Sequence, residues 1–413
     1  MLNIQNKIKS FILSKCVDPE NRMIGIEEES ILYSNNGLRL PIESRTVSNT
    51  KTITELLNNK KGLNGFYTME PGGQVEWSSP PFSNLNELFS SMKKHNRLFE
   101  SVVSKLKSKI IYFGLDPQFD PDAVDLIDDQ KYKIMDQKMK KIDGAGRWMM
   151  RNTASIQVNI DFLSLGDLED MVFVADCLHP VASYLFANSP YKLTKGNQMK
   201  NLRNIIWHNT DSERCRNLFD HGITNKKNLL EQYIELFLKT PAIFEIDLDK
   251  NVIDSNRKIG KILEDYKKSD IFSDKEILYL LRQIFTNVRI KNVVEVRGSD
   301  RPPRGFEISP AAFWTGVLTD IKTRKKILSI CSKWTERERK IFNRCALSLD
   351  KNNIGPDGEA YFSWIKCFGD LALEGLVNRK LGEEKFFESF YNYVIKNEPF
   401  SLQTQDKKPT FSA

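Results

Sequence analysis

Residues 68–78 read TMEPGGQVEWS and place two glutamates on either side of a Pro-Gly-Gly bend. Residues of equal parity in a strand share a face, so Glu70, Gln74 and Glu76 point the same way if the bend keeps its register. Carboxylates that face one space repel each other unless a cation lies between them, and Pro-Gly-Gly lets the backbone approach a ligand closely. The stretch therefore predicts a site for a metal ion and a phosphate group.

A second alternating segment, MIGIEEE at residues 23–29, carries another pair of carboxylates. Glu27 and Glu29 fall on one face, about 7 Å apart along the strand from the two-residue rise. That separation suits oxygens that reach one or two cations. Taken alone, however, the segment favours a solvated sheet edge with a charged outer face.

Two later segments complete a set of four predicted strands. The sequence WMMRNTASIQVNIDF at residues 148–162 alternates strictly and lines one face with Gln157, Asn159 and Asp161, side chains that orient ligands. The sequence VRIKNVVEVRG at residues 288–298 is predicted as a single strand. Its polar face carries Arg289, Lys291, Glu295 and Arg297.

Considered together, the four polar faces favour a binding site over a solvated surface. Lys and Arg make up 61 of the 413 residues, so a solvated face should be rich in lysine, yet the first three faces hold only Glu, Gln, Asn and Asp. Several carboxylates on one concave sheet require cations between them. The predicted metal ligands are Glu27, Glu29, Glu70, Glu76 and Glu295. Magnesium is the expected ion because it prefers hard oxygen ligands and bridges carboxylate to phosphate. Calcium stays open as an alternative, although the sequence has no EF-hand loop.

Arginines supply the predicted contacts to anions. Arg297 shares a face with Glu295 and can neutralise charge on a transferring phosphoryl group. Arg203 and Arg214 flank the aromatic patch of residues 202–211, and a guanidinium fork matches two carboxylate oxygens, although lone arginines usually lie on surfaces. The chain has neither a Walker GxxxxGK[ST] motif nor a GxGxxG motif, so P-loop and protein-kinase interpretations lack support.

Length and composition limit the class of protein. An apolar share of 40% in 413 residues supports one large or two ordinary globular domains. No apolar run approaches the roughly 18 residues of a membrane span, and the opening residues are too interrupted by lysine for a secretory signal, so we expect a cytoplasmic protein without a membrane partner. The six cysteines are scattered, which predicts neither zinc nor a disulfide framework. The net charge of +7 is interspersed, which fits a small anionic ligand and predicts no nucleic-acid partner.

Most of the remaining sequence predicts helices. Asn84 begins a capping box before a long apolar helix, on which His95 is expected at the surface. The apolar helix at residues 168–186 is expected to kink or break at Pro180. From Ser309 onward the pattern is almost wholly helical.

A series of short motifs occurs in order over residues 23–318. They are GIEEE at 25–29, MEPGGQVEWS at 69–78, TASIQVNIDF at 153–162, FANSP at 186–190, LRNIIWHNTD at 202–211, VRIKNVVEVRGSD at 288–300 and AAFWTG at 311–316. Together they resemble the glutamate–cysteine ligases of the plant and proteobacterial type, a branch of the glutamine synthetase superfamily. EPGGQ-x-E and E-x-RG-x-D are the specific elements. The chain departs at Glu307-Ile308-Ser309, where relatives have a cysteine, and at DRPPRGFE, which replaces a more glycine-rich loop.

The resemblance implies an ATP-dependent ligase that joins the γ-carboxylate of L-glutamate to the amine of L-cysteine through a γ-glutamyl phosphate, the first step of glutathione synthesis. The five glutamates would hold two or three Mg²⁺ ions around the ATP phosphates, with Glu295 and Arg297 as the catalytic pair. Arg297 would face the γ-phosphate, Arg203 the cysteine carboxylate, and Gln157 and Asn159 the substrate or the nucleotide. Gln74 and Arg214 complete the predicted substrate contacts.

The implied fold is α+β, an antiparallel sheet curved into a half barrel and backed by helices. A single ligase domain of residues 1–413 would comprise a catalytic sheet and helices at 20–320, a helical segment at 320–397 and a loose tail at 398–413, as a monomer or homodimer. Three alternatives stay open: a ligase of the same fold with another amine acceptor, supply of γ-glutamylcysteine to another thiol pathway, and a non-enzymatic nucleotide or nucleic-acid binder.

Overall fold

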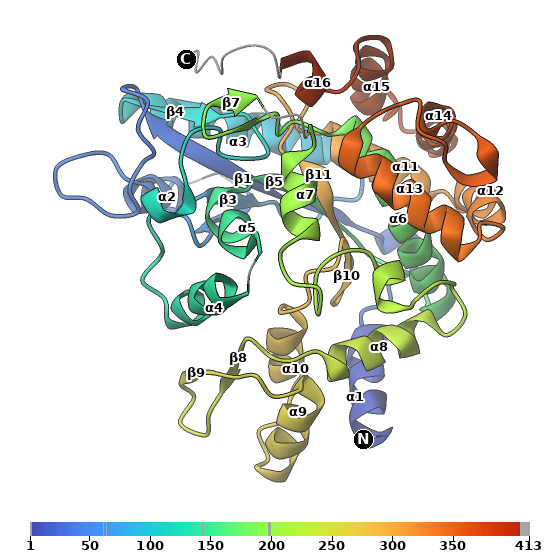
Figure 1. The fold of residues 1–413 in the computed structure, drawn as a ribbon, viewed down its shortest axis with the longest axis horizontal. Coiled ribbons are helices and arrows are strands. Elements are labelled where there is room, and N and C mark those ends of the chain that lie inside the picture. Colours follow the sequence, from blue (N-terminus) through green and yellow to red (C-terminus); the bar gives the residue numbers. More distant parts are fainter. Residues whose placement is uncertain (1, 61, 63, 143, 197–199, 405–413) are drawn as a thin grey trace.

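The computed structural model describes residues 2–60, 62, 64–142, 144–196 and 200–404 (Figure 1). Its centre is a seven-stranded antiparallel sheet in the order β10–β11–β5–β1–β3–β2, with β4 paired to the second half of β1. The strands are β1 Ile24–Ser34, β2 Phe66–Met69, β3 Val75–Ser78, β4 Ser108–Ile111, β5 Ser155–Ile160, β10 Val288–Ile290 and β11 Val294–Asp300. Two small hairpins pair β6 Tyr191–Lys192 with β7 Lys195–Gly196 and β8 Phe244–Ile246 with β9 Val252–Asp254. The predicted combination of an antiparallel sheet with many helices is confirmed.

The strand register brings the predicted polar residues opposite one another. Glu29 on β1 pairs with Glu76 on β3, and Glu27 pairs with Gln157 on β5. On the other side of β5, Asn159 pairs with Glu295 on β11. Directly opposed residues of antiparallel strands project from the same face of a sheet. Side chains that are far apart in the sequence therefore share one polar face.

The segment at residues 288–298 is a hairpin, not the single strand that its alternation predicts. β10 and β11 are joined by a tight turn in which the Lys291 amide donates to the Val293 carbonyl at 3.1 Å. Arg289 consequently lies directly across from Glu295. The sequence pattern misses this turn because a hairpin centred on Asn292 keeps odd-numbered residues on one face, as a continuous strand would.

Helices from both halves of the chain cover the apolar face of the sheet (Figure 1). Among the helices that contact the sheet are α3 Leu85–Lys105, α6 Leu165–Leu185 and α11 Ser309–Thr319. The later helices are α12 Ile321–Cys331, α13 Glu336–Ser348, α14 Tyr361–Asn378, α15 Lys385–Asn397 and α16 Phe400–Thr404. The remaining helices are α1 Leu2–Leu13, α2 Thr50–Asn58, α4 Gln130–Lys141, α5 Gly146–Asn152, α7 Leu202–His208, α8 Leu229–Lys239, α9 Ile259–Lys268 and α10 Asp274–Leu281. Within the described residues, no helix is both long and apolar enough to cross a membrane.

Several predicted helix features have a clear outcome. Asn84 caps α3 by accepting from the Glu87 amide, as its sequence predicts. Of the predicted kink or break at Pro180, the break is wrong, because α6 continues through Pro180 and is buried along nearly its whole length. Packing on all sides outweighs the lost backbone hydrogen bond. Of the tail that we expect to be loose, Phe400–Thr404 is helical, and residues 405–413 lie outside the described residues.

A buried ionic layer lies on the covered face of β1. Glu28 points away from its two neighbouring glutamates and forms an ion pair with Arg301 at 2.8 Å. His95 Nε2 lies 3.8 Å from the Glu28 carboxylate, and the His95 ring stacks on Trp77 with centroids 4.3 Å apart. The surface position predicted for His95 is therefore wrong. The residue follows Leu88 and Met92 along the buried side of α3, where an acidic partner makes a polar ring tolerable.

Candidate active site

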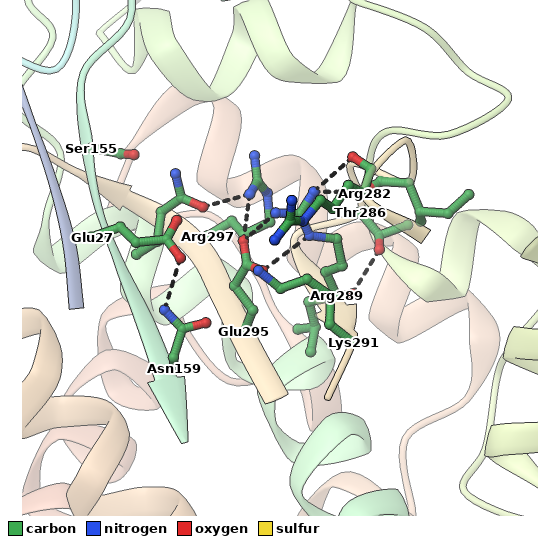
Figure 2. Close-up of polar contacts among 12 residues, drawn as sticks. Glu27, Ser155, Asn159, Arg282, Thr286, Arg289, Lys291, Glu295 and Arg297 are labelled. Carbon is green, nitrogen blue, oxygen red and sulfur yellow. Dashed lines mark hydrogen bonds and ion pairs between the residues drawn. The ribbon is translucent and has the colours of Figure 1, made fainter. Parts of the chain in front are cut away.

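A cavity of about 390 Å³ lies over the polar face of the sheet and is here called the sheet cavity. Four of the five predicted metal ligands line it: Glu27, Glu29, Glu70 and Glu76. The β10–β11 hairpin contributes the cationic side chains Arg289, Lys291 and Arg297 (Figure 2). Aromatic side chains, among them Tyr132, Trp207 and Phe285, complete the lining. The cavity thus joins a carboxylate-rich part to a cation-rich part.

Burial and neighbouring carboxylates raise the pKa of three acids of the sheet cavity, Glu29, Glu70 and Glu76. Burial, followed by the charges of Glu29 and Glu27, raises the pKa of Glu70 to about 7. Burial and then Glu70 hold the pKa of Glu76 well above its ordinary value. Burial also raises the pKa of Glu29. Without a bound metal ion, these acids resist ionisation.

A tight turn fixes Glu70 in the cavity. The Glu70 amide donates to the Gln74 carbonyl at 2.9 Å, and the Gly73 amide donates to the Glu70 carbonyl at 2.8 Å. Gly73 has a φ of +74°, a left-handed conformation that glycine adopts without strain. At Gly72 a Cβ atom would lie 2.3 Å from the Arg151 carbonyl oxygen, so this position has no room for a side chain. The Pro-Gly-Gly sequence is thus required by the close packing of the turn.

Gln74 holds this turn in place in the structure. Its Oε1 accepts from the Gly72 amide at 3.0 Å, and its Nε2 donates to the carbonyls of Met150 and Thr153. Only 2% of the residue is exposed. All its polar atoms contact backbone, so its predicted role as a substrate contact gains no support from the geometry.

The amides of β5 orient the β1 carboxylates. Gln157 Nε2 donates to Glu29 at 3.1 Å. Asn159 Nδ2 donates to Glu27 at 3.1 Å, a bond that Figure 2 shows. Ser155, a residue that the sequence analysis does not single out, donates to the second oxygen of Glu29 at 2.9 Å. Its even spacing from Gln157 and Asn159 is the signal that could have identified it.

Glu295 lies behind the cations rather than among the carboxylates (Figure 2). One oxygen accepts from Arg289 at 2.7 Å and Arg297 at 2.6 Å; the other accepts from Arg289 at 3.0 Å and contacts Lys291. Although burial alone would raise it, the three cationic charges hold the pKa of Glu295 well below its ordinary value. To serve as the predicted metal ligand, Glu295 must exchange one of these cations for the metal.

Arg203 and Arg214 occupy different places. Arg203 is 3% exposed, contacts Asp300 and donates to the Arg297 carbonyl at 3.1 Å. Both Arg203 and Arg297 lie over the Trp207 ring, but only Arg297 and Trp207 line the sheet cavity; Arg203 lines a small hollow beside it. Arg214 does not line the cavity, because it binds Asp211 at 2.6 Å and the carbonyls of residues 241 and 283. The substrate contact predicted at Arg214 is therefore not supported by its position.

Comparison with known proteins identifies the family. The model of glutamate–cysteine ligase family 2 (GCS2) matches residues 23–348. The chain belongs to glutamate–cysteine ligase family 2. This membership confirms the resemblance seen in the sequence and the prediction of an ATP-dependent ligase.

Curated relatives of this ligase are plant enzymes. The chain is 29% identical over 357 residues to chloroplastic glutamate–cysteine ligase A of Oryza sativa subsp. indica, covering 81% of this chain and 70% of the rice protein. It is 28% identical over 408 residues to the chloroplastic glutamate–cysteine ligase of Medicago truncatula, covering 93% of this chain and 78% of that protein. The fold is similar to that of a solved glutamate–cysteine ligase of Francisella tularensis in complex with AMP. That match has a TM-score of 0.57 at 12% identity and covers 92% of this chain and 84% of that one.

The side chains that line the sheet cavity fit magnesium. Among the described residues, four carboxylates and no histidine or cysteine side chain line it, and hard oxygen donors are what Mg²⁺ prefers. Within the same residues, no group of three or more His, Cys, Asp or Glu side chains is already arranged to hold one ion. Mg²⁺ in proteins keeps several waters and binds one or two carboxylates together with substrate phosphates.

The metal-free ligase is expected to lose stability as the pH rises from about 4.5 to 7. In this window the folded chain binds more protons than the unfolded chain, because the pKa of Glu70 is raised to about 7 and that of Glu76 is raised well above its ordinary value. Each raised acid therefore opposes folding once the unfolded chain has ionised. Glu28 and Glu295, whose pKa values are lowered, add stability that is lost only below this window.

Thermal melts in EDTA and in Mg²⁺ from pH 5 to pH 8 test this expectation. The melting temperature in EDTA should fall with rising pH, and the increase caused by Mg²⁺ should be larger at pH 8 than at pH 5. A melting temperature in EDTA that rises steadily across the window would contradict the crowding of acids in the cavity.

Proposed function

We propose that this ligase joins the γ-carboxylate of L-glutamate to the amine of L-cysteine in the sheet cavity, driven by ATP and with Mg²⁺ as the metal ion. The observation that carries the proposal is the meeting, in one cavity, of four acidic side chains with the three cations of the β10–β11 hairpin. Carboxylates of this kind hold metal ions, and the cations attract the phosphates that those ions bridge. A triphosphate with bound Mg²⁺ is a ligand that would contact both the carboxylate-rich and the cation-rich part of the sheet cavity.

The acidic part is proposed as the metal site. Glu27, Glu29, Glu70 and Glu76 would hold Mg²⁺, with Ser155, Gln157 and Asn159 orienting the two β1 carboxylates. Bound there, the metal would supply Lewis-acid stabilisation of charge on the phosphoryl oxygens. Asn159 Oδ1 is buried and has no partner among the described residues, which leaves it free to accept from the substrate or the nucleotide.

The cationic part is proposed to stabilise the transferring phosphoryl group. A γ-carboxylate oxygen of glutamate attacks the γ-phosphorus of ATP, ADP leaves, and a γ-glutamyl phosphate results. The cysteine amine then attacks the acyl carbon, loses a proton and displaces inorganic phosphate. Arg297 is the best placed of the three cations because it contacts both Gln157 on β5 and Glu295 on β11. Fixed positive charge at this position stabilises the developing negative charge without reorganisation.

Measurement of ADP and phosphate release tests the proposal. Release should require Mg²⁺, glutamate and an amine together, and cysteine should be preferred over a panel of other small amines. Preference for another amine would replace cysteine as the acceptor while retaining the acyl-phosphate chemistry. Absence of release with every amine in the panel would reject the ligase proposal.

Replacing Arg203 by alanine is expected to raise the KM for cysteine roughly ten- to a hundredfold with a smaller effect on the KM for glutamate, from the loss of one charge-assisted contact. The reason is its position in the hollow next to the sheet cavity, with an Nε that has no partner among the described residues. Steady-state kinetics with each amino acid varied in turn provides the measurement. An equal increase for glutamate would reassign the side chain to that substrate.

We further propose a cytoplasmic location, a half-barrel curvature of the sheet, and a single domain that acts as a monomer or homodimer. All six cysteines are free thiols, which suits a reducing compartment. The curvature is supported by side chains from β3 and from the β10–β11 hairpin, on opposite sides of β1 and β5, that line one cavity.

A further inference from the structure

A second cavity of about 290 Å³ lies on the other side of α7 from the sheet cavity. We call it the rear cavity. Its lining includes Asn204, His208, Arg216, Lys340, Asn343 and Arg344. These residues come from α7, from the loop that follows it and from α13, none of which contributes to the polar face of the sheet.

The rear cavity carries unpaired positive charge. Arg216, Lys340 and Arg344 form no ion pair within the part of the chain that the structure describes. In the sheet cavity, by contrast, the three hairpin cations all form ion pairs with one carboxylate, that of Glu295. The single acid of the rear lining, Asp220, already accepts from the Asn217 amide at 3.2 Å. Among the described lining residues, three cations against one carboxylate leave an excess of two positive charges, which produces a local field that attracts an anion.

The backbone holds one of these cations in an unusual conformation. Arg216 has a φ of +76°, a left-handed conformation that is rare for residues other than glycine. Its carbonyl accepts from the Asn287 amide at 2.9 Å, and its Nε donates to the His208 carbonyl at 2.9 Å. The terminal nitrogens of the guanidinium have no hydrogen bond among the described residues. Strain of this kind concentrates at ligand sites, where surrounding contacts maintain it.

Helix α7 separates the two cavities and contributes to both. Trp207 lines the sheet cavity, and Arg203, one turn earlier, lies beside it without lining that cavity. Asn204 and His208, also four residues apart, line the rear cavity. A small hollow of about 10 Å³ lies between them, shared through Trp207 on one side and Asn204 on the other. That volume holds at most about one water molecule, so no ligand passes through. Communication between the cavities would occur through the position of α7.

We propose that the rear cavity binds the phosphate group of a small anion, inorganic phosphate or a phosphomonoester, and that its occupancy adjusts how α7 presents Arg203 and Trp207 to the sheet cavity. The positive charges of Arg216, Lys340 and Arg344 exceed the single negative charge of Asp220 by two, which matches a doubly charged phosphate. Guanidinium forks and amide side chains also supply the donors that phosphate oxygens accept. The volume lies near the lower end of small-molecule sites, which run from about 300 Å³. The binding stands on its own, whereas the effect on substrates rests on the proposed function.

Calorimetric titration tests the binding. Inorganic phosphate and, in a separate experiment, glycerol 3-phosphate are titrated at low ionic strength into the full chain saturated with a non-hydrolysable ATP analogue and Mg²⁺, which occupies the sheet cavity. The double variant K340A/R344A should bind phosphate at least tenfold more weakly than the wild type. The matched control K325A/R337A removes the same two charges from exposed helix positions outside the cavity and should stay within twofold. Tighter binding of glycerol 3-phosphate than of phosphate would identify a phosphomonoester as the ligand.

Three results would overturn the binding proposal. They are equal weakening in the control, loss of phosphate binding when the ATP analogue is present, and unchanged affinity in K340A/R344A. If that variant unfolds, R344Q replaces it with the same expectation of weaker binding.

Kinetics tests the coupling through α7. Inorganic phosphate is a product of the proposed reaction, so the wild type and K340A/R344A should share the same product inhibition. Beyond that shared effect, added phosphate should change the KM for the amino-acid substrates only in the wild type, and the basal kcat of the variant should be unchanged. Equal phosphate effects in the two proteins would overturn the coupling. Because calorimetry requires no turnover, a failure of the ligase proposal would leave the binding result intact.

Discussion

Replacing Glu70 by glutamine is expected to lower kcat by two to four orders of magnitude, an order-of-magnitude estimate for the loss of a metal ligand that acts on the transferring group. The same change should raise the melting temperature of the metal-free protein. Ionisation of Glu70 is opposed by burial and by repulsion from Glu29 and Glu27, which raise its pKa to about 7. A neutral amide of the same shape removes that repulsion and, with it, part of the affinity for Mg²⁺.

Paired measurements of turnover and of thermal stability with and without Mg²⁺ check this result. The control is Glu359→Gln, which neutralises an exposed glutamate with no side-chain partner in the described part of the chain. It should leave kcat and both melting temperatures unchanged. Full activity of Glu70→Gln, or an undiminished stabilisation by Mg²⁺, would remove Glu70 from the metal site.

Replacing Glu295 by glutamine is expected to lower the free energy of unfolding by about 3 to 5 kcal/mol, the typical effect of removing one partner from a buried ion pair. The three cations that it neutralises would then repel one another in a buried place. Activity should also fall by orders of magnitude, because Arg297 loses the carboxylate that fixes its guanidinium. The sequence alone suggests only the loss of a metal ligand; the geometry adds the loss of stability.

The response to Mg²⁺ separates the two roles of Glu295. If Glu295 mainly anchors the cations, the variant should be destabilised in EDTA yet keep its stabilisation by Mg²⁺. If Glu295 is a metal ligand, that stabilisation should shrink as well. Chemical denaturation gives the free energies, and Lys291→Ala, which removes one cation and leaves two, serves as a milder variant if Glu295→Gln does not fold. Unchanged stability of both variants would contradict the network in Figure 2.

Sequence alternation predicted the acidic face of the sheet well, because side-chain parity depends only on local backbone. Glu27 and Glu29 on β1, and Gln157 and Asn159 on β5, project as their spacing requires. The antiparallel arrangement follows from the motifs that resemble a known family. Parity does not specify which strands become neighbours, so the direct pairing of Glu29 with Glu76 could not be read from the sequence.

The sequence did not predict features that depend on long-range partners. The sequence places His95 at the surface because its partners are distant along the chain. Glu28 lies on β1 and Trp77 on β3, whereas His95 lies on α3. Arg214 looked like a substrate contact because its neighbours are aromatic, yet its nearest acid, Asp211, binds it inside the protein. For a buried cation, the identity of the counter-charge decides between structural and binding roles, and only the folded chain reveals it.

The packing of Gly72 against Arg151 has a consequence for how the protein cycles between its empty and loaded forms. A turn that touches a neighbouring backbone this closely has no space into which it can withdraw, so Glu70 cannot relieve its crowding by swinging outward. Arrival and departure of ions should therefore alter protonation and side-chain pairing while the main chain around the turn remains still. In the metal-free protein, the unfavourable energy of the site would be electrostatic repulsion between carboxylates rather than backbone strain.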